Sequence, residues 1–492
     1  MQSKPYSGIA SFSFLLFLLL FSFIYNLGFI PIRIWDEGRV ATNALNMYLN
    51  NNWLITYFDG QPDLWNTKPP LLIWFQVISM KIFGVSEWSV RLPSAMASIL
   101  TGLTLWFFCT RYFKKPWLGF IAGAVFASTY PFIYNHAGRT GDYDALLTLF
   151  TTLYCFCFYF FIKTNKSKWL LAFFCGLILA VLTKGIAGLF FTPALALYAI
   201  FQKKLPYILK NKWFYTGIAS FILIVIGYYF LREQYNEGYI KAVLENEMGR
   251  HSKGLDKNNF PFSWYVVNIF VWRYLYWFLF LIPAFVYGFF SRSEEVKKFT
   301  AFNLLIVLTY LLIISTASTK LYWYDIPLYP FFAIQISFLL YAFWLFIQKK
   351  LNLSTTIQEM MVASLLFILI FTKPFRLVYT HNKHISHEKP WDLDVQQRNQ
   401  GLFMQQAIRN NKDLNNYVFC YDDCRDCHGQ IDFYIIQLQS KNVNVKFQET
   451  LDSLTSGSFI VVSQQKMKED LEKRYNAALI NEAYGCSVYI IK

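Results

Sequence analysis

The sequence predicts a polytopic α-helical membrane bundle followed by a small α/β domain at the C-terminus. Three observations carry this prediction. Of the 492 residues, 55% are apolar and only 15% are charged, a composition far from that of a soluble globular domain. The apolar residues form separate blocks, and roughly 20 such residues suffice to cross a bilayer as a helix. The Lys and Arg residues gather in short loops between these blocks, as they do in cytoplasmic loops of membrane proteins.

Eleven apolar blocks make up the predicted bundle, and we expect about 11 to 13 transmembrane helices. The first block follows a short segment carrying Lys4 and lacks a small-residue cleavage site, so we expect an uncleaved span with a cytoplasmic N-terminus. The stretch 71–84 is apolar over only 14 residues and contains Lys81, which favours an interfacial or re-entrant helix. The blocks cover residues 9–30, 88–110, 117–134, 144–162, 169–184, 186–201, 213–231, 264–290, 299–315, 321–346 and 357–373.

Basic residues mark one side of the membrane, because all five basic loops fall on that side when the blocks are threaded alternately. This side is predicted to be cytoplasmic, so we expect the cytoplasmic (inner) membrane as the location. The net charge of +15 therefore reflects topology and does not indicate nucleic-acid binding. The extracytoplasmic face receives the loops 31–87, 135–143, 183–185, 232–263 and 316–320 and the tail. The basic residues are Arg111, Lys114, Lys115, Lys163, Lys166, Lys168, Lys203, Lys204, Lys210, Lys212, Arg292, Lys297, Lys298, Lys349 and Lys350.

The chain is predicted to form two domains, a transmembrane domain at residues 1–373 and an extracytoplasmic α/β domain at residues 374–492. The tail is polar, and strand-like runs alternate in it with helix-like runs. The strand-like runs are YVFCY, VNVKF, SFIVVS and CSVYII, and the helix-like runs are IDFYIIQLQ and KMKEDLEKRY.

The first acidic candidates follow the first predicted span, in the segment RIWDEGR. Arg33 and Arg39 can be explained as interfacial anchors, but an adjacent pair of acids, Asp36 and Glu37, gains nothing from anchoring near anionic lipid head groups. Asp36 is therefore the leading candidate for a general base that deprotonates an acceptor hydroxyl or amine.

The second acidic candidates lie in the loop NHAGRTGDYD, which leads into the next span. An ionised carboxylate at the mouth of a span is expensive and is usually paired. The structural explanation for Asp144 is a salt bridge to Arg139. The functional explanation is that Asp144 orients an acceptor or holds a cation beside the general base.

Four basic residues occur in the extracytoplasmic loops, against the positive-inside trend. These residues are Lys68, Lys184, Arg250 and Lys320. Each one alone is equally explained by snorkelling to the interface. Together they suit a phosphate leaving group, which needs positive charge as a glycosidic bond breaks.

Six segments, taken in order and spacing, resemble a known family. They are WDEGR, TKPPLLIWF, FGVSEWSVRLPSA, GRTGDYDALLTLF, LTKGIAGL and STASTKLYWYDIPLYP, and the similarity covers roughly residues 30–345. The segments resemble the bacterial membrane glycosyltransferases of the protein O-mannosyltransferase type, in particular the lipid A aminoarabinose transferases (ArnT-like). The resemblance implies a GT-C fold, a polyprenyl-phosphate-linked sugar donor and transfer at the outer face of the cytoplasmic membrane.

The resemblance also implies roles for particular residues. The first-loop acid of the family falls on Asp36, the lysine of its K-P-P motif on Lys68, and its second acid on Asp144, with Asp142 as a near alternative. The implied catalytic residues are Asp36, Glu37, Asp142 and Asp144. The implied residues for the donor phosphate are Arg39, Lys68, Arg139, Arg250, Lys320 and Tyr324.

Two positions depart from the ArnT-like pattern. Thr67 stands where Glu is usual, and the Asn258-Asn259 stretch stands where a His is expected; these two positions resemble a metal pair in the relatives. We therefore expect no metal ligands and no required cofactor, with a divalent metal left open. The donor sugar and the acceptor, whether lipid, glycan or protein, are open as well.

A cysteine cluster in the tail, made of Cys420, Cys424, Cys427 and His428, contains the pattern C-x-x-C-H. A disulfide is the favoured explanation in an oxidising compartment, with a zinc site or covalent haem as alternatives. We assign no catalytic role to this cluster.

The function predicted from these features is sugar transfer from a polyprenyl-phosphate donor. A transporter or flippase of the same lipids is the alternative, and it would place ionisable residues in mid-span and show inverted repeats. A membrane scaffold or sensor built on the tail is a third class, which leaves the charged outer loops unexplained.

Overall fold

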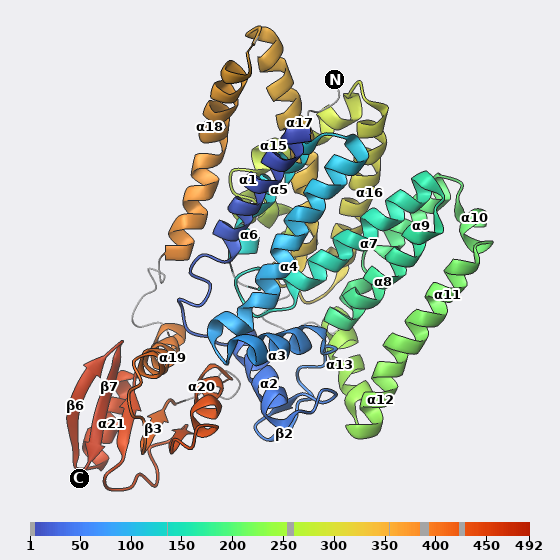
Figure 1. Cartoon of the computed structure of the whole chain (residues 1–492). Helices are drawn as coiled ribbons and strands as arrows, with labels where there is room; N and C mark the ends of the chain where they lie inside the picture. The colour runs from blue at the N-terminus through green and yellow to red at the C-terminus, as the bar shows by residue number, and fades with distance from the viewer. Residues whose placement is uncertain (1–4, 135, 253–259, 354, 384–392, 423–428) are drawn as a thin grey trace. The chain divides into compact units, whose positions relative to one another are not determined.

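The computed structural model describes residues 5–134, 136–252, 260–353, 355–383, 393–422 and 429–492 (Figure 1). The chain divides into two compact units. Unit 1 holds residues 1–25, 67–72 and 93–383, and unit 2 holds residues 26–66, 73–92 and 384–492. Both units are discontinuous in sequence, whereas the predicted division at residue 373 is linear.

Unit 1 is a helical bundle, in which Figure 1 shows α7 and α8 side by side. Its helices are α1 (Pro5–Phe23), α4 (Glu87–Phe108, whose start belongs to unit 2), η1 (Cys109–Phe113), α5 (Pro116–Ala127), α6 (Tyr130–Ile133), α7 (Asp144–Thr164), α8 (Ser167–Lys184), η2 (Gly185–Leu189), α9 (Thr192–Phe201), α10 (Leu205–Leu209), α11 (Lys212–Phe221), η3 (Ile222–Ile226), α12 (Gly227–Tyr235), α13 (Tyr239–Ser252), α14 (Trp264–Asn268), η5 (Ile269–Arg273), α15 (Phe278–Phe290), α16 (Glu294–Thr316), η6 (Tyr322–Leu328), α17 (Tyr329–Lys350) and α18 (Thr356–Lys383).

Seven helical segments within the described residues are long and apolar enough to cross a membrane, and an eighth is the pair Trp264–Arg273 and Phe278–Phe290, bent by 116°. The shorter apolar helices are Gly8–Phe23, Leu71–Phe83, Pro116–Ala127 and Thr192–Phe201. Every predicted apolar block falls on one of these helices, which confirms a multi-pass helical protein. The total of about 11 to 13 spans stays a prediction.

One cluster in the bundle is built from aromatic rings, and two of them lie three residues apart on one face of α7. The Phe108 ring stacks on Phe156 with 4.1 Å between centroids and lies 5.1 Å from Phe299. Tyr159, one turn beyond Phe156, lies 5.4 Å from the same Phe299 ring. These rings tie α4, α7 and α16 together in the C-terminal half of α7.

Unit 2 combines the first predicted outer loop with the tail. Its elements are α2 (Asp36–Asn50), β1 (Tyr57–Phe58), β2 (Gln61–Pro62), α3 (Leu71–Phe83, whose first two residues belong to unit 1), α19 (Leu393–Arg409), β3 (Tyr417–Cys420), α20 (Gly429–Gln439), β4 (Val445–Gln448), β5 (Phe459–Val462), α21 (Gln465–Arg474), β6 (Ala477–Ala483) and β7 (Cys486–Ile491). The predicted helix at 71–84 is present as α3.

The tail forms a five-stranded sheet in the order β4-β3-β5-β7-β6. The strands β4, β3 and β5 are parallel, and β7 pairs antiparallel with β5 and β6. Val418, Ile460 and Tyr489 pack with Leu471 of α21 in its core. The predicted small α/β domain is confirmed, including the four strand runs and two helices named from the sequence. The edge strand β6 was not predicted, because its side chains are largely exposed and show no buried alternation.

Candidate active site

An ion pair joins the start of α7 to the end of α8 in unit 1. Lys184 Nζ donates to Asp144 Oδ1 at 2.5 Å, and both side chains are buried, with exposed fractions of 8% and 3%. Each charge suits its helix end, since a carboxylate is favoured at an N-terminus and an ammonium at a C-terminus. α8 ends at Lys184 because Gly185 follows with a φ of 55°, which glycine adopts without strain. The partner of Asp144 considered from the sequence was Arg139; the structure adds Lys184.

Two lysines lie over tyrosine rings next to this ion pair, and one of the two lysines belongs to the pair itself. Lys68 Nζ lies 5.8 Å from the centroid of the Tyr143 ring, and Tyr143 directly precedes Asp144. Lys184 Nζ lies 5.6 Å from the Tyr324 ring. A desolvated cation near an aromatic face is stabilised without losing its charge. Unit 1 therefore brings together Lys68, Asp144, Lys184 and Tyr324, four of the residues singled out in the sequence.

The helix α13 reaches both lysine-bearing segments. Tyr239 OH donates to the carbonyl of Thr67, the residue before Lys68, at 2.8 Å. Glu247 comes close to the residue after Lys184, because a Cβ on Gly185 would lie 3.6 Å from Glu247 Oε1. The predicted outer loop 232–263 thus contributes a helix to this site. The Arg250 side chain and the Asn258-Asn259 pair lie outside the described residues.

The loop that precedes α7 is held by His136. Its ring stacks on Trp323 with 3.6 Å between centroids, and its Nδ1 lies 3.7 Å from Asp142 Oδ2. Ser94 Oγ donates to the backbone carbonyl of Asp142 at 2.8 Å. Arg139 Nη1 donates to the carbonyl of Ser22 at 3.1 Å. Asp142 and Arg139 thus have contacts that hold this loop in place.

Near Tyr324 lie two further charged groups. Lys320 is buried and donates to the Ala317 carbonyl at 2.7 Å, and burial lowers its pKa. Asp325 accepts two hydrogen bonds of 2.7 Å from Arg273 and one of 2.8 Å from Tyr329. Sequence reasoning did not single out Asp325 or Arg273, although an acid inside an apolar segment already indicates a buried partner.

The acidic pair of the first loop lies in unit 2, at the start of α2. Asp36 is half-buried and is the first residue of that helix. Both oxygens of Glu37 are bound by Arg91, at 2.7 and 2.9 Å, and the backbone N of Arg33 donates to Glu37 at 2.8 Å. Burial alone would raise the pKa of Glu37, but the Arg91 guanidinium holds it below its ordinary value. Glu37 therefore has the contacts of a structural ion pair.

Arg39, two residues after Glu37 in α2, also forms an ion pair. It binds Asp63 with two hydrogen bonds, 3.0 Å from Nε and 2.8 Å from Nη2. Its guanidinium lies 4.0 Å from the Phe58 ring and 4.7 Å from the Trp65 ring. Burial raises the pKa of Asp63, yet hydrogen bonds and charge from Arg39 hold it below the ordinary value. In this conformation Arg39 holds the loop that follows α2, through its contacts with residues 58–65.

Asp36, Glu37 and Arg39 lie in one unit, and Lys68, Asp144, Lys184, Lys320 and Tyr324 lie in the other. The expectation that Asp36 meets Asp144 and Lys68 stays a prediction.

The remaining candidates from the sequence are a metal site and the cysteine cluster of the tail. Within the described residues, no group of three His, Cys, Asp or Glu side chains is arranged to hold a metal. Cys420 is a free, buried thiol in β3, and burial raises its pKa to about 12. Cys424, Cys427 and His428 lie outside the described residues.

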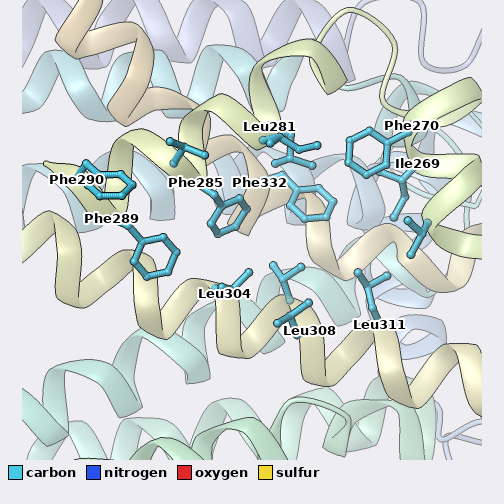
Figure 2. Close-up of a pocket in the computed structure, with 14 residues that line it drawn as sticks. Ile269, Phe270, Leu281, Phe285, Phe289, Phe290, Leu304, Leu308, Leu311 and Phe332 are labelled. Atoms are coloured by element: carbon cyan, nitrogen blue, oxygen red, sulfur yellow. The ribbon is translucent and has the colours of Figure 1, made fainter.

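A groove in unit 1 is lined by apolar side chains alone (Figure 2). It has a volume of about 450 Å³ and lies between the bent helix pair α14–α15, α16 and α17. Phe270, Phe285, Phe289 and Phe332 project into it from two sides.

Parts of this sequence are similar to the sequences of known proteins. Residues 67–229 match the family described as dolichyl-phosphate-mannose-protein mannosyltransferase. An uncharacterized protein of Aquifex aeolicus is 29% identical over 332 residues, which make up 65% of this chain and 62% of that protein. The undecaprenyl phosphate-alpha-4-amino-4-deoxy-L-arabinose arabinosyl transferase of Aeromonas salmonicida is 30% identical over 203 residues, 40% of this chain and 36% of that protein. The chain thus spans less than two thirds of the length of these two relatives.

Solved structures share the fold over nearly the whole chain. ArnT from Cupriavidus metallidurans bound to undecaprenyl phosphate aligns with 96% of this chain and 96% of its own, with a TM-score of 0.63 and 14% identity. An Archaeoglobus fulgidus oligosaccharyltransferase aligns with 90% of this chain and 64% of its own, with a TM-score of 0.56 and 12% identity. The predicted resemblance to the GT-C membrane glycosyltransferases is therefore confirmed.

Proposed function

We propose that this chain is a glycosyltransferase of the cytoplasmic membrane that moves a sugar from a polyprenyl-phosphate donor to a lipid, glycan or protein acceptor at the extracytoplasmic face. The observation that carries the proposal is the grouping of Lys68, Lys184 and Asp144, with the Tyr324 ring beside Lys184. The first three residues lie within the stretch that matches the mannosyltransferase family. The fold shared with an undecaprenyl-phosphate-bound ArnT supports the class of donor.

The proposed reaction needs positive charge at one point and a base at another. The acceptor hydroxyl or amine attacks the anomeric carbon, the bond from that carbon to the phosphate oxygen breaks, and polyprenyl phosphate leaves with the bonding electrons. In this proposal Lys68 and Lys184 stabilise the negative charge of the departing phosphate, and their positions beside Tyr143 and Tyr324 support this role. The acceptor proton passes to Asp36 in this proposal.

Other groups have supporting roles in the proposal. Asp144 holds Lys184 in position, and Glu37 holds the start of α2 through Arg91. The apolar groove of Figure 2 is a place of suitable chemistry for part of an isoprenoid chain. The proposed steps require no metal or other cofactor, and binding of a divalent metal is left open.

Mass spectrometry of surface glycolipids and glycoproteins from a deletion strain tests the proposal. We expect one sugar mass to disappear, to return with the wild-type gene, and to stay absent with Asp36→Asn. Asp59→Asn is the matched control, because Asp59 is an exposed acid of the same loop. An unchanged set of sugar masses would overturn the proposed function, and restoration by Asp36→Asn would overturn the role of Asp36 alone.

Proteoliposomes separate the enzyme from a transporter. They are loaded with the purified protein and a polyprenyl-phosphate sugar that carries a label. A glycosyltransferase forms a new covalent product with an added acceptor, whereas a flippase changes only the leaflet in which the labelled lipid resides.

A further inference from the structure

Helices α2 and α20 of unit 2 cross with their backbones in direct contact. A Cβ built on Gly38 would lie 2.6 Å from the backbone N of Gln430, and one built on Gly429 would lie 2.9 Å from the backbone N of Arg39. Both separations are too short for a real side-chain carbon. Thr42 Oγ1 donates to the Gly429 carbonyl at 2.8 Å, one turn further along α2. The crossing therefore depends on a glycine in each helix.

A second contact lies just before α2, at Ile32. Its backbone N donates to Tyr434 OH at 3.0 Å, and its carbonyl accepts from Gln430 Nε2. Both backbone groups of this buried residue are thus bound by side chains of α20. Tyr434 OH in turn donates to Glu87 Oε1 at 2.7 Å, and its pKa is raised by burial and by the Glu87 charge, which keeps the hydroxyl protonated.

Between these two contacts the backbone is strained at Trp35. Trp35 has a φ of 66° and a ψ of −128°, a backbone conformation that residues other than glycine rarely adopt. Such a strained residue persists only where the surrounding contacts hold it in place. Asp36 follows it directly, so the direction of the Asp36 side chain depends on how firmly residues 32–38 are held.

We propose that α20 of the C-terminal domain positions Asp36, with Gln430 and Tyr434 as positioning residues and the Gly38–Gly429 contact as the pivot. The inference rests on the proposed function in one respect, since it takes Asp36 as the general base. The tail is then a working part of the enzyme that acts through the first loop.

Amide hydrogen exchange tests the structural half of this proposal without reference to activity. In the full-length protein in nanodiscs, Tyr434→Phe and Gly429→Ala are expected to raise the exchange rate of residues 36–42 at least tenfold. Tyr489→Phe is the matched control, because its hydroxyl also donates to a glutamate, Glu472, within the tail. Gly227→Ala is the glycine control, because a Cβ there meets nothing within 4 Å. Unchanged exchange in both test variants would overturn the proposal.

Kinetics test the functional half. A displacement of about 1 Å in a catalytic group lowers turnover by roughly 100-fold, so we expect kcat of Tyr434→Phe to fall at least tenfold. KM for the polyprenyl-phosphate sugar and Kd for undecaprenyl phosphate should stay within twofold, because the proposed phosphate lysines lie in unit 1. Tyr489→Phe should keep the wild-type kcat.

The outcomes distinguish this inference from the proposed function. Faster exchange with an unchanged kcat would show that α20 holds α2 but does not position the base, and it would overturn the inference. Absence of any sugar transfer by the wild-type protein would overturn the proposed function, whatever the exchange rates. If Gly429→Ala fails to fold, Tyr434→Phe still decides, since it removes one oxygen and adds no volume.

Discussion

Lys184 Nζ lies 2.5 Å from Asp144 Oδ1, so the C-terminus of α8 and the N-terminus of α7 share one buried ion pair. In Asp144→Asn, Lys184 loses this counter-charge and becomes more available to an anionic ligand. We expect the affinity for undecaprenyl phosphate to rise a few-fold, while sugar transfer falls by roughly 100-fold because Lys184 is no longer held in position. Binding and transfer assays on the purified protein measure the two effects.

Asp452→Asn is the control for this substitution, because Asp452 forms an ion pair on the exposed surface of the tail. It should change neither assay. Weaker binding in Asp144→Asn would contradict the competition between the carboxylate and the phosphate.

Lys68 offers a second test of the proposed phosphate site. A hydrogen bond to a charged group contributes about 1.5–3 kcal/mol, so Lys68→Ala should weaken undecaprenyl phosphate binding by roughly 10- to 100-fold. Lys68→Arg should recover part of the loss, since it keeps the charge near Tyr143. Lys210→Ala, on an exposed loop, is the control. Equal affinities of the wild-type protein and Lys68→Ala would remove Lys68 from the site.

Much of the fold could be predicted because hydrophobic blocks and loop charges are local signals. The ends of α7 and α8 illustrate this, since Asp144 and Lys184 were both singled out as charges at the mouths of apolar blocks. Their pairing could not be predicted, because it depends on how two antiparallel helices are aligned 40 residues apart. Periodicity assigns a residue to a helix face, but it does not name the neighbour on the next helix.

Contacts between distant segments account for the main features that the sequence did not reveal. Arg91 was present in a quoted motif, yet its ion pair with Glu37 joins residues 54 positions apart. The crossing of α2 and α20 depends on Gly38 and Gly429, and isolated glycines in helical patterns carry no signal about their partners. For the same reason the grouping of the first loop with the tail was not anticipated.

The Glu37–Arg91 pair makes the stability of unit 2 depend on pH. The pKa of Glu37 is lowered in the folded protein from its ordinary value of 4.5, so its stabilising effect is complete above pH 4.5 and is lost as the pH falls through the lower, folded value. Breaking a buried pair by removing one partner's charge costs about 3–5 kcal/mol, so Glu37→Gln should unfold at a lower temperature at pH 7. The difference from wild type should shrink steadily below pH 4.5.

Thermal unfolding of both proteins between pH 7 and pH 3.5 measures this dependence. Glu294→Gln is the control, because Glu294 pairs with Lys297 on an exposed helix start. A gap that stays constant down to the lowest pH would contradict the ion-pair explanation.

Arg39 separates a structural role from phosphate binding. Arg39→Lys keeps the charge but loses the two-pronged contact with Asp63 and the stacking on Phe58. We expect the free energy of unfolding to fall by about 1–3 kcal/mol, so that the variant unfolds at a lower temperature. The affinity for undecaprenyl phosphate should be unchanged. Arg474→Lys is the matched control, because its pair with Asp452 is exposed and contributes less than about 1 kcal/mol. Weaker phosphate binding with unchanged stability would instead favour the role implied by the resemblance.

The orientation in the membrane decides on which face sugar transfer takes place. The five basic loops predict that Lys210 faces the cytoplasm and that the tail, including Ser456, lies outside. Both positions are exposed in the structure, so cysteines introduced there can react freely. In intact spheroplasts, a membrane-impermeant maleimide should label Ser456→Cys above the level of the unsubstituted chain and should label Lys210→Cys only after permeabilisation. The opposite pattern would place the tail and the first loop in the cytoplasm, and an outer-face transfer reaction would then be untenable.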